Sequence, residues 1–395
     1  MLRRVYLDNS ATTQVAPEVL EAMMPFLTEN FGNPSSIHHF GQIARSAVDK
    51  ARHQVAEILN ARPNEIIFTS GGTESNNLAI RGLIQELIRK EPDVRPHIIT
   101  SVIEHPAVKM VCEDLEKSGC DVTFLPCHED GVVRFEDVVA AMTDRTVLIS
   151  IMTANNEIGT LQPVAEIGTF VRSLRNDGRK IYFHTDAVQA IGKIKVDVEE
   201  IGCDLLSLSA HKIHAPKGVG ALFVRRGTRL HPQNIGGKQE RGIRGGTDAV
   251  PQIVGLGKAA EMAGEKMHED AERLRQMRDR FETAVFEMIP DTHLNGSRDR
   301  RVPNISNISF GSVEGEGLLI NLDMQGIAVS TGSACSSGSL EPSPIIRALG
   351  REDQLARGAI RFSFGRYNGD EDVEHTLAIL PRAVETLRSL APPKR

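Results

Sequence analysis

The chain has 395 residues, which is long for one hydrophobic core and suits two domains. Hydrophobic residues make up 40% of the chain, with 4% aromatic and no tryptophan, so the core must rest on aliphatic side chains, as in many α/β proteins. A formal net charge of −6 provides no basic footprint for nucleic acid, and five cysteines without framework spacing argue for a reducing compartment rather than a disulfide scaffold.

The start of the chain carries no recognisable targeting signal. Arg3 and Arg4 are followed by only three apolar residues before Asp8, so the apolar core of a signal peptide is missing. The longest apolar run, residues 147–152 with Ser150 inside it, is far too short to cross a bilayer. We therefore expect a soluble cytoplasmic protein without a membrane partner.

The first predicted elements are joined by polar loops. Residues 5–8 should form a short strand, and Pro17 opens a helix. The loop 30–38 that follows is rich in glycine, asparagine, proline and serine and has no apolar period. Such a loop either carries function or is an ordinary turn, and its residues alone leave both interpretations open.

A glycine-rich turn joins the predicted strand 65–69 to the next helix. Gly71 and Gly72 allow close approach to the backbone, and Thr73 supplies a hydroxyl just where the helix begins. This arrangement presents free N–H groups and a positive dipole end to an anion, so it is a candidate phosphate seat. The spacing matches neither a P-loop nor a dinucleotide fingerprint. A plain glycine turn with Thr73 as the helix N-cap is the alternative.

His105 lies at the end of another predicted strand, 98–102, with Pro106 opening the next helix. Open α/β sheets place ligands at the carboxyl ends of their strands, so His105 lies on the expected ligand side. The strand 147–152 likewise runs into a polar cluster, residues 153–159. A single histidine is usually structural, and both a structural and a functional role stay open here.

Three cysteines, Cys112, Cys120 and Cys127, follow His105 and precede His128. Their gaps of eight and seven residues match no zinc pattern, and Cys112 falls among the apolar residues of a predicted helix. We interpret them as packing thiols and expect no metal site.

The stretch from residue 182 to residue 225 contains two predicted apolar strands, and each of them ends in a polar cluster. The first strand runs into Asp186, and the second runs into Lys212. Pyridoxal phosphate (PLP) needs a lysine for its Schiff base and an acidic partner that keeps its pyridine nitrogen protonated. The pair therefore predicts a PLP site. A surface lysine and a turn-forming aspartate explain these two residues equally well on their own.

The region after Lys212 indicates the direction of the next strand in the sheet. The turn 216–218 is too short for a parallel crossover, so the strand 219–224 should be antiparallel to its neighbour and the sheet mixed. The segment 236–247 is rich in glycine and charge and lacks an apolar face, so it could reach a partner subunit. The apolar stripe of the helical pattern 251–288 indicates core or interdomain packing.

The C-terminal part should form a second domain with a reactive thiol. Cys335 lies among small and polar residues with glycines on both sides, which is typical of an exposed, mobile loop. Such a thiol can act as a nucleophile if its pKa is lowered or if a base takes its proton. Arg361, in an alternating strand, either pairs structurally or clamps a carboxylate. We place the large domain at residues 16–262 and the small domain at residues 1–15 and 263–395.

Taken together, these segments resemble the cysteine desulfurases of nitrogen fixation and iron–sulfur cluster assembly, within the class V aminotransferase superfamily. The resemblance covers nearly the whole chain. It implies a fold-type I PLP-dependent transferase, with a mixed, mostly parallel seven-stranded sheet in the large domain and a smaller α+β domain. The matching segments, in the family's order, are YLDNSATT, NFGNPSSIH, IIFTSGGTESNNLAI, EHPAV, NNEIG, HTDAVQ, SLSAHKIHAPKGVGALFVRR, RGIRGGT, STGSACSSGSLEPS and IRFSFGR.

The resemblance also implies roles for individual residues. Lys212 would form the Schiff base, Asp186 would pair with the pyridine nitrogen, and His105 would stack on the ring and shuttle a proton. Cys335 would receive the sulfur. Further cofactor-binding residues implied by the resemblance are Gly72, Thr73, Asn156, Gln189, Ser209 and His211, with Thr247 from the other subunit of a homodimer, and the implied substrate-binding residues are Asn33, Asn156 and Arg361.

The activity implied by the resemblance is conversion of L-cysteine to L-alanine, with a persulfide left on Cys335. The persulfide would pass to an acceptor such as an iron–sulfur scaffold protein. No extension like the one that docks the scaffold in some members is visible after residue 388, so the acceptor stays open. A selenocysteine lyase or a class V aminotransferase would keep Lys212 and Asp186 without needing Cys335 on a long arm. A non-catalytic sulfur-relay subunit would keep the fold without PLP.

Overall fold

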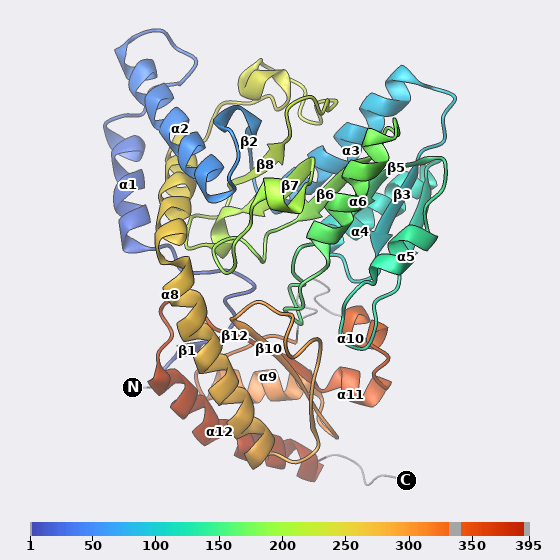
Figure 1. The fold of residues 1–395 in the computed structure, drawn as a ribbon. Coiled ribbons are helices and arrows are strands. Elements are labelled where there is room, and N and C mark those ends of the chain that lie inside the picture. The colour runs from blue at the N-terminus through green and yellow to red at the C-terminus, as the bar shows by residue number, and fades with distance from the viewer. Residues whose placement is uncertain (1, 332–340, 391–395) are drawn as a thin grey trace.

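A computed structural model describes residues 2–331 and 341–390 and shows two lobes joined by one long helix (Figure 1). This helix, α8 (Val250–Met288), starts beside the large sheet and ends in the lobe that holds the C-terminal elements. It contributes Ile253 and Leu256 to the core of the large lobe and Phe281 and Val285 to the core of the small lobe. The same helix therefore packs on both cores.

The large lobe is organised around a seven-stranded sheet with the order β2-β8-β7-β6-β5-β3-β4. β8 runs in the opposite direction to the other six strands of this sheet. This confirms the predicted mixed, mostly parallel sheet and the antiparallel strand after the short turn. Every residue of β6, β7 and β8 except Tyr182 is buried, as expected for strands covered on both faces. The strands are β2 (Ile66–Thr69), β3 (His97–Ser101), β4 (Asp121–Leu125), β5 (Thr146–Ser150), β6 (Tyr182–Asp186), β7 (Leu205–Ser209) and β8 (Gly220–Val224).

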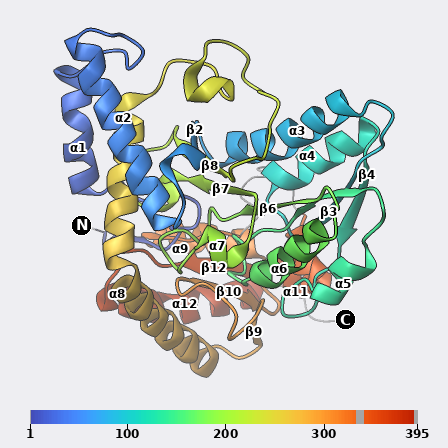
Figure 2. The same cartoon turned by 45° about the horizontal axis from the view of Figure 1, so that its top comes forward.

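Helices cover both faces of this sheet (Figures 1 and 2). Alternate side chains of a strand point to opposite faces, so Ile66 and Phe68 enter one core while Ile67 enters the other. The first core is covered by α1 (Pro17–Thr28), α2 (His39–Ile58), α6 (Val164–Asn176) and the first part of α8. The second core is covered by α3 (Gly72–Lys90) and α4 (Pro106–Lys117), which lie side by side. The shorter helices of this lobe are η1 (Pro63–Glu65), α5 (Phe135–Ala140), α7 (Val198–Ile201), η2 (Ala210–Lys212) and η3 (Gln239–Gly242).

The small lobe combines helices with an antiparallel three-stranded sheet of order β12-β10-β9 and the two-stranded pair β1-β11. β1, near the N-terminus, pairs in parallel with β11, which lies in the C-terminal part of the chain. The first residues therefore pack in this lobe. The predicted boundary at residue 262 stays a prediction, since α8 passes through it unbroken. The elements are β1 (Val5–Tyr6), β9 (Thr292–Leu294), β10 (Ile305–Phe310), α9 (Gly315–Met324), β11 (Ile327–Ala328), α10 (Pro344–Ala348), α11 (Asp353–Arg357), β12 (Ala359–Ser363) and α12 (Asp370–Leu390).

The N-terminal segment 8–14 ties the lobes together at the carboxyl ends of the central strands. In the small lobe, the backbone N–H of Asn9 donates to the carbonyl of Ser363 at 3.2 Å. In the large lobe, the backbone N–H of Thr13 donates to the carbonyl of His211 at 2.9 Å, one residue before Lys212. Residues from three distant parts of the chain therefore meet at one edge of the sheet. Across residues 2–331 and 341–390, no helix combines the length and apolar character that a membrane crossing requires.

Candidate active site

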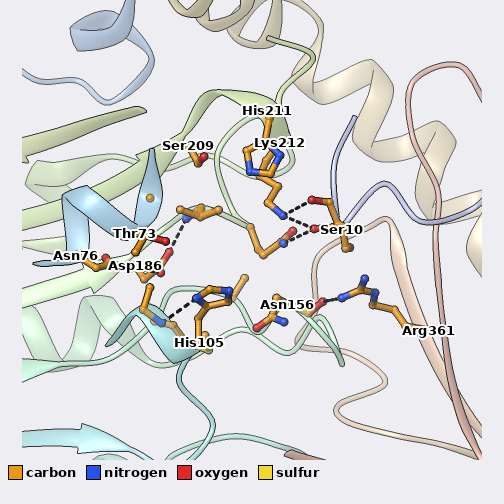
Figure 3. A pocket seen from close by; sticks show the side chains of 17 residues that line it. Ser10, Thr73, Asn76, His105, Asn156, Asp186, Ser209, His211, Lys212 and Arg361 are labelled. Atoms are coloured by element: carbon orange, nitrogen blue, oxygen red, sulfur yellow. Dashed lines mark hydrogen bonds between the residues drawn. The ribbon is translucent and has the colours of Figure 1, made fainter. Parts of the chain in front are cut away.

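A cavity of about 280 Å³ lies at this edge (Figure 3). It is bounded by the ends of β6 and β7, the first turns of α3 and α4, the N-terminal segment and β12. A pocket where strand ends and helix starts converge is the usual location of a ligand site in an α/β protein. The predicted site residues that line it are Gly72, Thr73, His105, Asn156, Asp186, Gln189, Ser209, His211, Lys212 and Arg361.

Lys212 projects from η2, the single turn that follows β7. Its Nζ donates to the backbone carbonyls of Ser10 at 2.6 Å and Ala11 at 2.8 Å, so Lys212 and Ser10 face one another across the cavity (Figure 3). Both acceptors are neutral. The amine is thus held in place inside the cavity by the N-terminal segment.

Asp186 is the last residue of β6 and is 6% exposed. One carboxylate oxygen accepts from Nδ2 of Asn76 at 2.7 Å, and the other accepts from the backbone N–H of Val188 at 2.9 Å. These bonds fix the carboxylate at the cavity wall. A buried acid in this position can pair with a protonated ring nitrogen of a ligand.

The first turn of α3 forms the candidate anion seat. Gly71 is the N-cap, with φ +153° and ψ −177°, so the alternative with Thr73 as N-cap is wrong. A Cβ on Gly72 would approach Val188 to 3.0 Å, so a side chain there would crowd the cavity. Ser209 at the end of β7 and His211 in η2 line the same cavity. Burial lowers the pKa of His211 to about 4, and Lys212 and Lys217 act in the same direction, so its imidazole is neutral.

His105 is the N-cap of α4, and its Nδ1 accepts from the backbone N–H of Ala107 at 3.1 Å. Because Nδ1 is an acceptor, the proton of the neutral ring lies on Nε2. Burial lowers the pKa of His105, while Asp186 opposes that shift and Lys212 adds to it. A neutral imidazole with one nitrogen fixed by the backbone is suited to exchange a proton through the other.

Arg361 lies in the middle of β12, and its side chain is 4% exposed. One of its terminal nitrogens donates to the carboxylate of Asp8 at 2.7 Å, and the other donates to the backbone carbonyl of Asn156 at 2.9 Å. The guanidinium therefore lies at the cavity with a carboxylate already bound. Arg361 therefore pairs structurally with Asp8, and its role as a clamp for a carboxylate ligand stays a prediction.

Several buried polar atoms around the cavity have no hydrogen-bond partner among the described residues. They are Oγ of Ser10, Oδ1 of Asn76, Oδ1 of Asn156 and Nε of Arg361. Buried polar groups are normally satisfied, so this cluster indicates a polar ligand. An amine, a carboxylate, an aromatic imidazole and an anion seat on one cavity fit the groups of PLP.

Two predicted residues do not join the cavity, and a third lies outside the described residues. Asn33 and Thr247 are exposed on surface loops and do not line it within one chain. The loop of Thr247 is attached to α3, because Arg244 pairs with Glu74 at 2.8 Å. Cys335 falls in residues 332–340, outside the described residues.

Sequence reasoning missed several groups at the site. Asn76 supports Asp186, Asp8 holds Arg361, and the carbonyls of Ser10 and Ala11 hold Lys212. Asn76 and Asp8 lie inside the motifs quoted above, so only their positions along those motifs could have drawn attention to them. Backbone carbonyls leave no signal in a sequence.

Glu104, next to His105, is a further buried acid that sequence reasoning did not use. Its Oε1 accepts from Oγ of Ser101 at 3.0 Å and from the backbone N–H of Met152 at 2.8 Å. Burial raises the pKa of Glu104 to about 8; the bond from Met152 opposes this shift, and the charge of Asp186 adds to it.

The remaining cysteines behave as packing thiols. Cys112, Cys120, Cys127 and Cys203 are buried, and burial raises the pKa of Cys112 to about 12 and that of Cys127 to about 11. Thiols in this state are poor nucleophiles at neutral pH. Within the described ranges, no group of three or more His, Cys, Asp or Glu side chains is arranged to hold a metal ion.

Fold and cavity together define an α/β protein with a lysine amine in a cavity at the carboxyl ends of its central strands. A family model described as aminotransferase class-V matches residues 5–376. The chain belongs to the class-V aminotransferase family, and within it to the cysteine desulfurases, as the following relatives show. This confirms the resemblance seen in the sequence.

Curated relatives match over the full length of the chain. The cysteine desulfurase IscS of Dictyoglomus turgidum is 51% identical over 395 residues, covering 100% of this chain and 98% of the relative. The IscS of Methanosarcina thermophila is 49% identical over 390 residues, covering 99% and 94%.

Solved structures agree with this assignment. A NifS-like protein is 37% identical with a TM-score of 0.89, covering 97% of this chain and 100% of that one. The structure of SspA in complex with cysteine is 38% identical with a TM-score of 0.81, covering 93% and 100%.

Proposed function

We propose that this chain is a PLP-dependent cysteine desulfurase that takes the sulfur of L-cysteine onto Cys335 and releases L-alanine. The observation that carries the proposal is the convergence of Lys212, Asp186, His105 and Arg361 on one cavity of about 280 Å³. Relatives at about half identity over their full length carry the name cysteine desulfurase, which supports the same reaction.

The residues around the cavity suit the groups of PLP. Lys212 would bind the aldehyde carbon, Asp186 the ring nitrogen, and Gln189 the phenolic oxygen. Gly72, Thr73, Ser209 and His211 would hold the phosphate at the start of α3, where helix N–H groups favour an anion. When bound, PLP supplies an electron sink that makes the α hydrogen of an amino acid acidic.

The protein's own groups then handle substrate and protons. Arg361 would bind the carboxylate of L-cysteine, with Asn156 beside it, and the amine of Lys212 would remove and return the α proton. His105, through Nε2, would take the proton of the incoming thiol. Asn33 is proposed to contact substrate only in the assembled protein, because it is exposed in one chain.

The sulfur transfer balances without an external oxidant. The thiolate of Cys335 attacks the sulfur of the substrate, the bond between that sulfur and Cβ breaks, and an S–S bond forms. The carbon fragment gains a proton and leaves as L-alanine. The outer sulfur of Cys335 then passes to an acceptor thiol, which we propose belongs to an iron–sulfur scaffold protein in the cytoplasm.

We further propose a homodimer in which Thr247 of one subunit completes the phosphate seat of the other. Two loops support this assembly, because Phe31, Ile37 and Ile235 are 71%, 92% and 84% exposed. Large apolar side chains on neighbouring surface loops favour burial by a second copy. The same two loops carry Asn33 and Thr247.

Mass spectrometry of the protein after exposure to L-cysteine tests the reaction. We expect the mass of the peptide that contains Cys335 to increase by one sulfur, and alanine to form in equal amount. The Cys335→Ala variant should retain PLP and lose both products. Undiminished sulfide and alanine release by that variant would instead indicate a lyase of another substrate, such as selenocysteine. A colourless protein that does not respond to PLP would indicate a sulfur-relay subunit.

A further inference from the structure

Lys193 is a buried amine that the reaction described above does not use. It lies in the helical turn that follows β6 and is 8% exposed. Its Nζ donates to the side-chain oxygen of Gln189 at 2.8 Å and to the backbone carbonyl of Gln189 at 3.1 Å. Neither acceptor is a carboxylate. Burying an amine costs desolvation free energy, which an apolar side chain of similar size would avoid. We therefore expect a role of Lys193 beyond packing.

The contact with Lys193 determines which way the amide of Gln189 faces. Nζ of Lys193 donates to both oxygens of Gln189, so the amide oxygen is the end that faces Lys193. The Nε2 group is therefore turned to the opposite side, where it donates to the carbonyl of Ser10 at 2.9 Å. Both contacts hold the amide in the same sense, because the carbonyl of Ser10 can only accept, and without the lysine only Ser10 would orient it.

The opposite side of Gln189 is the cavity. Nε2 carries two hydrogens and donates one of them to Ser10, whose carbonyl also accepts from Nζ of Lys212 at 2.6 Å. Gln189 lines the cavity together with Lys212, so the second hydrogen is available to a ligand there. The order of groups is Lys193, Gln189, Ser10 and Lys212. This chain of contacts links the buried amine to the reactive one.

We propose that Lys193 is a positioning residue that holds Gln189 as a hydrogen-bond donor to an anionic oxygen of the bound ligand. The inference rests on the proposed function, in which that oxygen is the phenolic oxygen of PLP. The hydrogen bond from Lys193 to the amide oxygen also polarises the amide, which strengthens its donation to an anion. Burial lowers the pKa of Lys193 to about 7, and Lys212 and Arg361 act in the same direction.

Titration of coenzyme-free protein with PLP tests this role. Lys193→Met keeps the length of the side chain and removes the donor, so we expect PLP to bind on the order of tenfold more weakly. The absorbance of the bound PLP should shift toward the form in which its ring oxygen is protonated. The matched control is Lys195→Met, two residues further on and exposed, which should change neither readout.

A double-variant cycle separates positioning from a general effect on the fold. In a Gln189→Leu background, adding Lys193→Met should weaken PLP binding no further, because the amide that Lys193 orients is gone. Equal weakening in both backgrounds would overturn the proposal, as would a Lys193→Met variant with the parent's affinity and spectrum. Those two results would leave the proposed function intact. Failure of the parent protein to bind PLP would instead overturn both the proposed function and this role.

Discussion

At the scale of single residues, the site depends on buried polar groups whose charge is set by their surroundings. Glu104 is 3% exposed, and its Oε2 finds no hydrogen-bond partner among the described residues. With its pKa raised to about 8, the carboxyl keeps its proton at neutral pH. Because Glu104 is neutral, it adds no second negative charge near that of Asp186.

The raised pKa of Glu104 predicts a pH-dependent effect of Glu104→Gln on stability. An unfolded chain releases this proton near pH 4.3, so the parent loses stability as the pH rises from about 4.3 to about 8. Glutamine mimics the protonated acid and does not titrate. The free energy of unfolding of the variant minus that of the parent should therefore increase with pH. We expect this difference to rise by at least about 1 kcal/mol from about pH 5 to about pH 8.

Urea unfolding at both pH values measures this gain. The control is Glu116→Gln on the exposed side of α4, which should show no such trend. A stability difference between parent and Glu104→Gln that stays constant with pH would show that Glu104 is ionised in the folded protein.

At the scale of elements, the start of α3 depends on a backbone conformation that only glycine adopts easily. Gly71 has φ +153° and ψ −177°, and a Cβ there would meet nothing closer than Oγ of Ser209 at 3.9 Å. Space is therefore available, and the backbone angles alone exclude other residues. This turn aims the first N–H groups of α3 at the cavity.

We predict that Gly71→Ala lowers the free energy of unfolding by about 1–3 kcal/mol through this strain, and that it weakens binding of phosphate-bearing ligands. The matched control is Gly264→Ala in α8, where an added Cβ meets no described atom within 4 Å. That helical substitution should stabilise the protein by up to about 1 kcal/mol. Urea unfolding of the three proteins measures both effects, and equal stability of Gly71→Ala and the parent would contradict the strain.

At the scale of the whole molecule, one chain leaves predicted parts of the site outside the cavity. Thr247 is exposed, and the ion pair between Arg244 and Glu74 attaches its loop to the first turn of α3. A homodimer would resolve this separation, because each loop could complete the cavity of the other subunit.

Mixed dimers of two variants test whether Thr247 acts across subunits. Thr247→Ala should weaken PLP binding by about tenfold through the loss of one hydrogen bond to phosphate, and Lys212→Ala should abolish activity. A dimer of one chain of each kind would then contain one intact site, made from Lys212 of one subunit and Thr247 of the other. We expect this site to bind PLP with the affinity of the parent, as measured by activity against PLP concentration. Weak binding in every mixed dimer would place Thr247 in the cavity of its own chain.

Much of the fold followed from local patterns. The apolar runs that ended in polar clusters became β3, β5, β6 and β7, because strands buried on both faces are mostly apolar while their ends need not be. Element ends were less accurate. The strand predicted at residues 147–152 spans Thr146–Ser150. The start of α2 at His39 is marked by His38, whose Nδ1 accepts from the backbone N–H of Gly41, a signal that apolar periodicity does not contain.

By itself, the sequence determined the type of sheet and the family, and it predicted Lys212 and Asp186 as the chemical pair, because these depend on patterns within short segments. Only the tertiary structure decided what holds these groups. Asp8 meets Arg361 across 353 residues, and the carbonyl of Ser10 accepts from both Lys212 and Gln189. Such contacts depend on how the N-terminal segment closes between the lobes, and hydrogen bonds between residues so far apart leave no periodic trace in the chain.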